Sequence, residues 1–158
     1  MIESHPFSDV FPLLSDTELK ALAEDIRVNG LKESIWTFED AILDGRNRHA
    51  ACLLAEVEPK FRQFKGSRRS ALALVVSANL KRRNLDLSQR AMVGVSLLPH
   101  YEQLAKERQG ARTDIKETFP EGDAGQSRDA AGKAVGVSGK LIDAAAKVVD
   151  KGCKPRNS

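Results

Sequence analysis

The sequence predicts an α+β protein, in which a small mixed N-terminal domain precedes a mostly helical C-terminal part with a helix-turn-helix. Two observations predict this class. In the first half, short apolar runs bounded by turn residues alternate with apolar residues at helical spacing. Beyond residue 87, helical spacing dominates, and two glycines near the end mark a helical corner. A chain of 158 residues is long enough for one domain, or for a small domain with an appendage.

The elements of the first half follow from local signals. Ser15 and Glu18 form a capping box, and Gly30 suits the left-handed cap that closes the helix behind it. Glu39 and Asp40 separate two short apolar runs, as a tight turn separates the strands of a hairpin. The predicted elements are a helix over 16–29, strands over 35–38 and 41–43, a helix over 46–57, a strand over 61–64 and a helix over 68–79.

A strand, a glycine turn and a helix N-terminus meet at Gly45. The unpaired N–H groups of a helix start and the helix dipole favour an anion there. The guanidinium groups of Arg46 and Arg48 add donors that suit phosphate oxygens. The sequence therefore predicts a phosphate site at this corner. The alternative is that both arginines only solvate the helix start.

A second polar segment lies at the end of the predicted helix over 68–79. Asn79 is followed three residues later by Arg82, so an amide and a guanidinium could join Arg46 and Arg48 at one place. The alternative is a solvated basic helix end, whose side chains bind its own last carbonyl groups.

The C-terminal part contains a helical connector, a linker and a helix-turn-helix. Pro99 predicts a kink or a break in the connector. The linker is polar, contains glycine and has no periodic pattern, so we predict it to be flexible. The predicted divisions are a first domain over 4–86, the connector over 87–108, the linker over 109–126 and the helix-turn-helix over 127–152.

The helix-turn-helix follows from small residues at fixed spacing. Gly132 lets the second helix approach the first, Gly136 makes the turn, and Ser138 caps the second helix. In such motifs the start of the second helix enters the major groove, so Ser138, Lys140 and Lys147 are the predicted DNA contacts. The alternative is an ordinary helical hairpin. The predicted shared core consists of Val135, Val137 and Ile142.

The charge distribution and the composition indicate which classes of partner and which cellular compartment to expect. Residues 60–90 hold nine basic residues against one acidic residue, which favours nucleic acid or a nucleotide as partner. The alternative is neutralisation by the acidic block over 1–44, which holds ten acidic and three basic residues. Two cysteines and the absence of a long apolar run predict a cytoplasmic protein without a membrane span.

Two segments together resemble a known family, the ParB-type partition proteins. The segment 45–51 resembles their Gly-Glu-Arg-Arg box, and the segment 79–82 resembles their Glu-Asn-Leu-x-Arg box. The order of elements matches over residues 4–95. The resemblance implies that 4–86 is a nucleotide-binding domain, whose fold is shared with sulfiredoxin and with a free-serine kinase.

The resemblance also implies ligands and roles for individual residues. It implies CTP or another nucleoside triphosphate with Mg²⁺ as cofactor. Gly45 and Arg48 would contact phosphates with Arg46 nearby, Asn79 would help to hold the metal ion, and Arg82 would lie near the nucleotide. Family members place a helix-turn-helix after this domain, so DNA is the implied partner and a homodimer the implied form.

The chain departs from both boxes. Arg46 replaces the glutamate of the first box, and Ala78 replaces the glutamate of the second. These changes favour phosphate binding over hydrolysis, so we assign no catalytic residue and expect at most a slow nucleoside triphosphatase. The sulfiredoxin cysteine would fall at Arg46, which excludes that activity.

The expected function is a ParB-like DNA-binding protein that acts in DNA partition or transcriptional regulation. The alternatives are a nucleotide-dependent small-molecule kinase of the same superfamily, and a plain transcription regulator with an inactive pocket.

Overall fold

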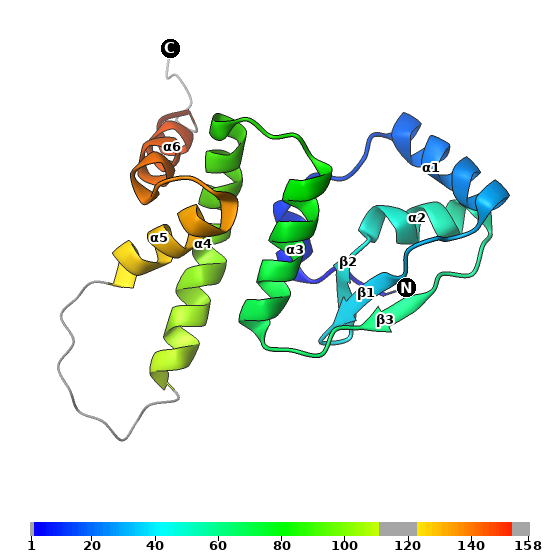
Figure 1. The fold of residues 1–158 in the computed structure, drawn as a ribbon, viewed down its shortest axis with the longest axis horizontal. Coiled ribbons are helices and arrows are strands. Elements are labelled where there is room, and N and C mark those ends of the chain that lie inside the picture. The colour runs from blue at the N-terminus through cyan, green and yellow to red at the C-terminus, as the bar shows by residue number, and fades with distance from the viewer. Residues whose placement is uncertain (1, 111–122, 153–158) are drawn as a thin grey trace, which may run out of the picture. The chain divides into compact units, whose positions relative to one another are not determined.

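The computed structural model describes residues 2–110 and 123–152, which form six α-helices, one short 3-10 helix and a three-stranded sheet (Figure 1). The predicted α+β class is confirmed. The chain divides into two compact units, Met1–Val75 and Val76–Ser158. The division falls inside a helix, whereas the sequence analysis placed the end of the first domain at residue 86. Among the described helices, none combines the length and the apolar character that a membrane span requires.

The first unit contains the sheet and the helices around it. Strand β1 lies in the middle, antiparallel to β2 and parallel to β3. The strand at 61 and the hairpin before it lie where the sequence predicts them. The elements are η1 (Pro6–Val10), α1 (Asp16–Asn29), β1 (Ile35–Phe38), β2 (Ala41–Asp44), α2 (Arg46–Ala55), β3 (Phe61–Gln63) and the first half of α3 (Arg68–Arg82).

Helix α1 begins with the predicted capping box. Ser15 Oγ accepts a hydrogen bond from the backbone N–H of Glu18, and the Glu18 carboxylate accepts from the backbone N–H of Ser15 at 2.9 Å. Gly30 ends the helix with φ of 73°, a conformation that costs glycine little. Both predicted helix ends are confirmed.

The turn between β1 and β2 has an unusual backbone. Glu39 and Asp40 have φ of 49° and 59°, the left-handed region that a two-residue hairpin turn requires. The Glu39 carboxylate accepts a hydrogen bond from Arg68 at 2.9 Å and lies 3.3 Å from Nε2 of the buried His5. The side chains of His5, the N-cap of η1, and of Arg68 in α3 therefore stabilise a turn that neither residue favours by itself.

The core of the first unit lies where α1 and α2 pack on the sheet. Ile35 and Ile42 of the sheet, Ile26 of α1, and Ala51 and Cys52 of α2 are all buried there. The apolar positions of α1 face inward at helical spacing, as the sequence predicts, whereas Leu53 and Leu54 of α2 are exposed.

The buried Cys52 gives a test of this packing. Burial raises the pKa of the Cys52 thiol, and the charge of Arg48 opposes this shift. In a Cys153→Ser background, we expect iodoacetamide to alkylate Cys52 at pH 8 only when the chain unfolds. Because the thiol pKa is higher in the folded state than in the unfolded state, the contribution of this group to stability is fully present below the ordinary thiol pKa of about 8.5. That contribution is lost as the pH rises through the pKa of the folded state. Rapid alkylation under native conditions would contradict the buried position.

The second unit is helical in its described residues. It consists of the rest of α3, α4 (Leu87–Gly110), α5 (Asp123–Val135) and α6 (Gly139–Gly152). Helix α4 packs against both α5 and α6, which also pack on each other. The helix is not broken at Pro99. Pro99 lacks only the one N–H that would bond to the carbonyl of Val95, and the helix continues on both sides of it.

The predicted flexible linker is shorter than expected at both ends. Helix α4 continues to Gly110, and α5 begins at Asp123 instead of 127. The polar, glycine-containing sequence gives no periodic signal there, which is why the pattern missed these helical turns. The rest of the predicted linker, 111–122, lies outside the described residues.

Candidate functional site

The corner between β2 and α2 has the predicted strand, glycine and helix order. Gly45 is the N-cap of α2 with φ of 103° and ψ of 25°. A Cβ atom at this position would lie 3.1 Å from both Nε and Nη2 of Arg48. The backbone conformation therefore favours glycine here, and an added side chain would also press on the guanidinium of Arg48.

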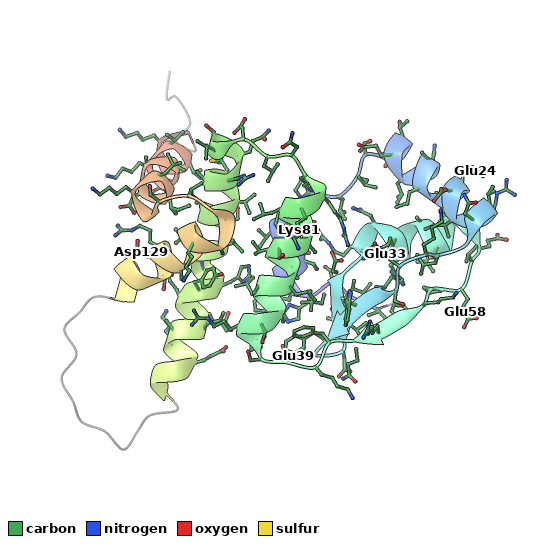
Figure 2. All side chains as sticks on the ribbon, viewed as in Figure 1. Glu24, Glu33, Glu39, Glu58, Lys81 and Asp129 are labelled. Carbon is green, nitrogen blue, oxygen red and sulfur yellow. The ribbon has the colours of Figure 1, made fainter. Side chains whose placement is uncertain are left out.

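Arg48 is held by two carboxylates. Its Nη2 donates to Oδ2 of Asp44 at 2.8 Å, and its Nη1 donates to Oε2 of Glu33 at 2.9 Å and to the Glu33 carbonyl oxygen at 3.2 Å. The side chains of Arg48 and Asp44 are only 13% and 8% exposed, whereas that of Glu33, labelled in Figure 2, is 68% exposed. Arg48 thus connects β2, α2 and the segment before β1 through a largely buried ion pair.

Arg46 and Asn47 connect α2 to the N-terminal segment. Arg46 Nη1 pairs with Oδ1 of Asp9 at 2.5 Å, and its Nη2 donates to the carbonyl oxygen of Phe11 at 2.7 Å. The side-chain oxygen of Asn47 accepts from the backbone N–H of Leu14 at 3.2 Å. Neither arginine is simply solvated, so the alternative of a solvated helix start is wrong. All three partner acids of Arg46 and Arg48 belong to the acidic block over 1–44.

The second predicted segment, 79–82, lies in the C-terminal half of α3. Asn79 and Arg82 belong to the second unit, and both take part in interactions with other residues. The backbone carbonyl of Asn79 accepts from the N–H of Arg83 at 3.0 Å. The meeting of this segment with Arg46 and Arg48 stays a prediction. Within the described residues, no three His, Cys, Asp or Glu side chains are grouped to hold a metal ion, and the proposed role of Asn79 toward Mg²⁺ stays a prediction as well.

The predicted helix-turn-helix has the expected local geometry. Gly136 forms the corner with φ of 73°, and the N–H of Val137 donates to the carbonyl oxygen of Gly132 at 2.9 Å. Ser138 Oγ accepts from the N–H of Leu141 at 3.3 Å and so caps α6. A Cβ atom at Gly132 would lie 2.7 Å from the carbonyl oxygen of Val137. The predicted close approach at Gly132 is confirmed.

Gly132→Ala should therefore destabilise the second unit. The added methyl group meets backbone atoms, which cannot move aside as a side chain can, so we expect a loss of about 2 kcal/mol in the free energy of unfolding. Gly136→Ala is the matched control, because its Cβ would meet only Arg90 Nη1 at 3.6 Å. Its cost is that of the left-handed backbone alone, about 1 kcal/mol. Urea denaturation of both variants measures the difference, and an equal cost would contradict the close approach.

The apolar residues of the motif face α4. Ile142 and Val135 are buried, and the space beside Gly94 of α4 is filled by the side chains of both. Val137 is only half-buried, which corrects the prediction that it fills the shared core. Val137 belongs to the corner itself, where the chain reaches the surface.

The polar face of α6 carries the two predicted lysines and Lys151, and an acid that the sequence analysis missed lies on α5 beside the start of α6. Lys140, Lys147 and Lys151 are all exposed. Asp129 of α5, labelled in Figure 2, places its carboxylate against the backbone of Gly139, the first residue of α6. A carboxylate stabilises a helix N-terminus, and Arg128 pairs with Asp143 beside it at 2.5 Å. The spacing of Asp129 to Gly132, one helical turn, is the only signal that the sequence offered.

Comparison with models of known protein families finds no match for this chain, and comparison with curated proteins finds none either. Its function is therefore inferred from geometry and charge.

Proposed function

We propose that this chain is a ParB-like DNA-binding protein that contacts duplex DNA through α5 and α6. The ParB-like part of the proposal rests on the resemblance at 45–51 and 79–82. One observation carries the DNA contact: a tight α5–α6 corner presents a capped helix with three exposed lysines, which are Lys140, Lys147 and Lys151. The first turn of α6 offers few side chains that could contact base edges. Contacts to phosphates would therefore supply most of the affinity for DNA. A homodimer would place two such helices on neighbouring half-sites.

The corner at Gly45 is the proposed phosphate site for CTP or another nucleoside triphosphate. The exposed carboxylates of Asp9 and Glu33 stand where phosphate oxygens would bind Arg46 and Arg48. The carboxylate of each pair is exposed to solvent while the arginine is largely buried, so a multiply charged phosphate arriving from solvent could displace the carboxylate. The buried pair of Arg48 with Asp44 would remain and orient the guanidinium.

The same ion pairs favour a second candidate function, a transcription regulator in which this corner is purely structural. In that protein Arg46 and Arg48 hold the N-terminal segment and the sheet together, and no nucleotide binds. The two candidates share the DNA contact and differ only at this corner.

Duplex binding is tested by fluorescence anisotropy with labelled DNA over a range of salt concentrations. Each lysine that contacts a phosphate contributes about one unit to the slope of log affinity against log salt. We therefore expect Lys140→Ala/Lys147→Ala to reduce this slope by about two units. The control Lys20→Ala/Lys32→Ala removes two exposed cations from the first unit and should leave the slope unchanged. Equal slopes for all three proteins would contradict the assignment to α6.

The corner is tested by calorimetric titration of CTP, ATP and GTP with Mg²⁺. If the corner binds phosphate, Glu33→Gln raises the affinity, because it removes a competing carboxylate, and Arg46→Ala lowers it. If neither the wild type nor Glu33→Gln binds nucleotide at millimolar concentration, the phosphate site is refuted. The transcription regulator with a structural corner is then the remaining candidate.

A further inference from the structure

Strand β3 forms the edge of the sheet, and in the described part of the chain no strand pairs with its outer side. Its pairing with β1 extends by one residue at each end, since the N–H of Ile35 donates to the Lys60 carbonyl and the N–H of Phe64 donates to the Thr37 carbonyl, both at 2.7 Å. Side chains alternate along an extended strand, so those of Lys60, Arg62 and Phe64 share one face at intervals of about 6.6 Å.

This face carries a row of aromatic rings. The strand register places Arg62 opposite Trp36, and the guanidinium carbon lies 4.6 Å from the centroid of the indole ring. The Phe64 ring stands edge-on to Trp36 at 6.3 Å and to Phe38 at 5.9 Å. Trp36 and Phe64 are half-buried, and Arg62 is exposed. The row therefore reaches the surface at Trp36, under the guanidinium of Arg62.

The cations of β3 and of the segment that follows it make no ion pairs within the described part of the chain. Lys60, Arg62, Lys65 and Arg69 are exposed, and none of them forms an ion pair with another described residue. By contrast, the arginines of the Gly45 corner are both paired with carboxylates. The nearest acid along the chain is Glu58, which Figure 2 labels on the segment that leads into β3.

We propose that this surface, the β3 platform of Trp36, Lys60, Arg62 and Phe64, binds single-stranded nucleic acid. A base would stack on the guanidinium plane that covers the indole ring, or on the ring itself once Arg62 turns to a phosphate, and Lys60 would contact a neighbouring phosphate. The combination of aromatic rings with exposed cations favours a single strand over other anionic partners. An acidic peptide would use the cations but not the rings, and a duplex keeps the faces of its bases stacked inside. The platform belongs to the first unit and does not depend on the duplex contact proposed for α6.

Trp36 is the only tryptophan of the chain, so intrinsic fluorescence reports on the platform directly. The full chain is titrated with a thymidine oligonucleotide of about 12 nucleotides, within the range that single-strand-binding folds cover. We expect saturable quenching of the Trp36 emission, because a base stacks on the ring, and an affinity that falls as the salt concentration rises. Quenching of equal size by polyglutamate at the same charge concentration would overturn the proposal.

Two variants separate the platform from general electrostatics. Lys60→Ala/Arg62→Ala keeps the fluorescent residue and should lower the affinity about tenfold or more. The control Lys20→Ala/Lys32→Ala removes the same charge from exposed positions of the first unit and should bind as the wild type does. Equal losses in both variants would overturn the proposal. Trp36→Phe, followed with a labelled oligonucleotide, keeps a ring for stacking and should retain binding if the platform acts as described.

The same experiment distinguishes this proposal from the proposed function. Lys140→Ala/Lys147→Ala should lose affinity for duplex DNA and keep the quenching by the oligonucleotide. If this variant loses the quenching instead, the single strand is held by α6 and the β3 platform is not a binding surface. If the oligonucleotide binds normally while no duplex binding is found, only the function proposed for α5 and α6 fails.

Discussion

Arg48→Ala should lower the free energy of unfolding by about 3 kcal/mol, because it removes the guanidinium from a largely buried carboxylate. Arg48 and Asp44 are 13% and 8% exposed, and the bond between them is 2.8 Å long. Urea denaturation followed by Trp36 fluorescence measures the loss. Since the cost comes mainly from the carboxylate that stays behind, Asp44→Asn/Arg48→Ala should be more stable than the single variant.

The matched control is Arg27→Ala. Arg27 pairs with Glu24 on the surface of α1, and both side chains are more than half exposed, so the loss of this ion pair should change the stability little. A comparable cost in both variants would contradict the structural role of Arg48. The expected instability also affects any nucleotide assay, because lost binding by Arg48→Ala would not separate a missing phosphate contact from a disturbed fold. Arg46→Ala and Glu33→Gln change the same corner without leaving the buried Asp44 unpaired.

Ile142→Ala is expected to cost the second unit about 3 kcal/mol, as deletion of a fully buried branched side chain usually does. Ile142 fills the space beside Gly94 and against Val135, so its loss leaves a cavity among three helices. The duplex affinity should fall together with the stability, because this contact fixes α6 on the helices that support it. Circular dichroism during urea denaturation and anisotropy with duplex DNA measure the two effects.

Val148→Ala provides the comparison for Ile142→Ala. Val148 lies on the same helix but is 66% exposed, so its truncation should change the free energy of unfolding by no more than about 0.5 kcal/mol. A large effect at Val148 and a small one at Ile142 would mean that α6 packs through its other face.

Local signals predicted most of the fold. The capping box at Ser15, the two-residue turn at Glu39 and the corner at Gly136 each depend on a few neighbouring residues, and all three are found where they were expected. The ends of the linker were placed less well, because 109–110 and 123–126 carry no apolar period although they are helical. Periodicity detects a helix by the face that it buries, and a helix end without such a face gives no signal.

The candidate sites were predicted only in part. Residues close together in the sequence were placed correctly, whereas contacts between residues far apart in the sequence were not predicted. The sequence placed Gly45, Arg46 and Arg48 at one helix start, as the structure has them. It could not pair them with Asp9 and Glu33, because nothing in the pattern specifies which acid of the block over 1–44 reaches which arginine. The β3 platform was missed for the same reason: its central contact joins Trp36 to Arg62 through a parallel strand pairing that only the folded sheet creates.

The N-terminal segment has a consequence for the order of folding during synthesis. Its contacts are made with residues that leave the ribosome much later: His5 donates to the carbonyl of Ile42, Asp9 pairs with Arg46, and Leu14 donates to Asn47. At a translation rate of about 5–20 residues per second, the segment waits seconds for these partners. The part of this unit that is made first is thus among the last to become ordered, and a nascent chain stalled with this segment outside the ribosome and residue 42 still inside it should leave the segment open to proteases.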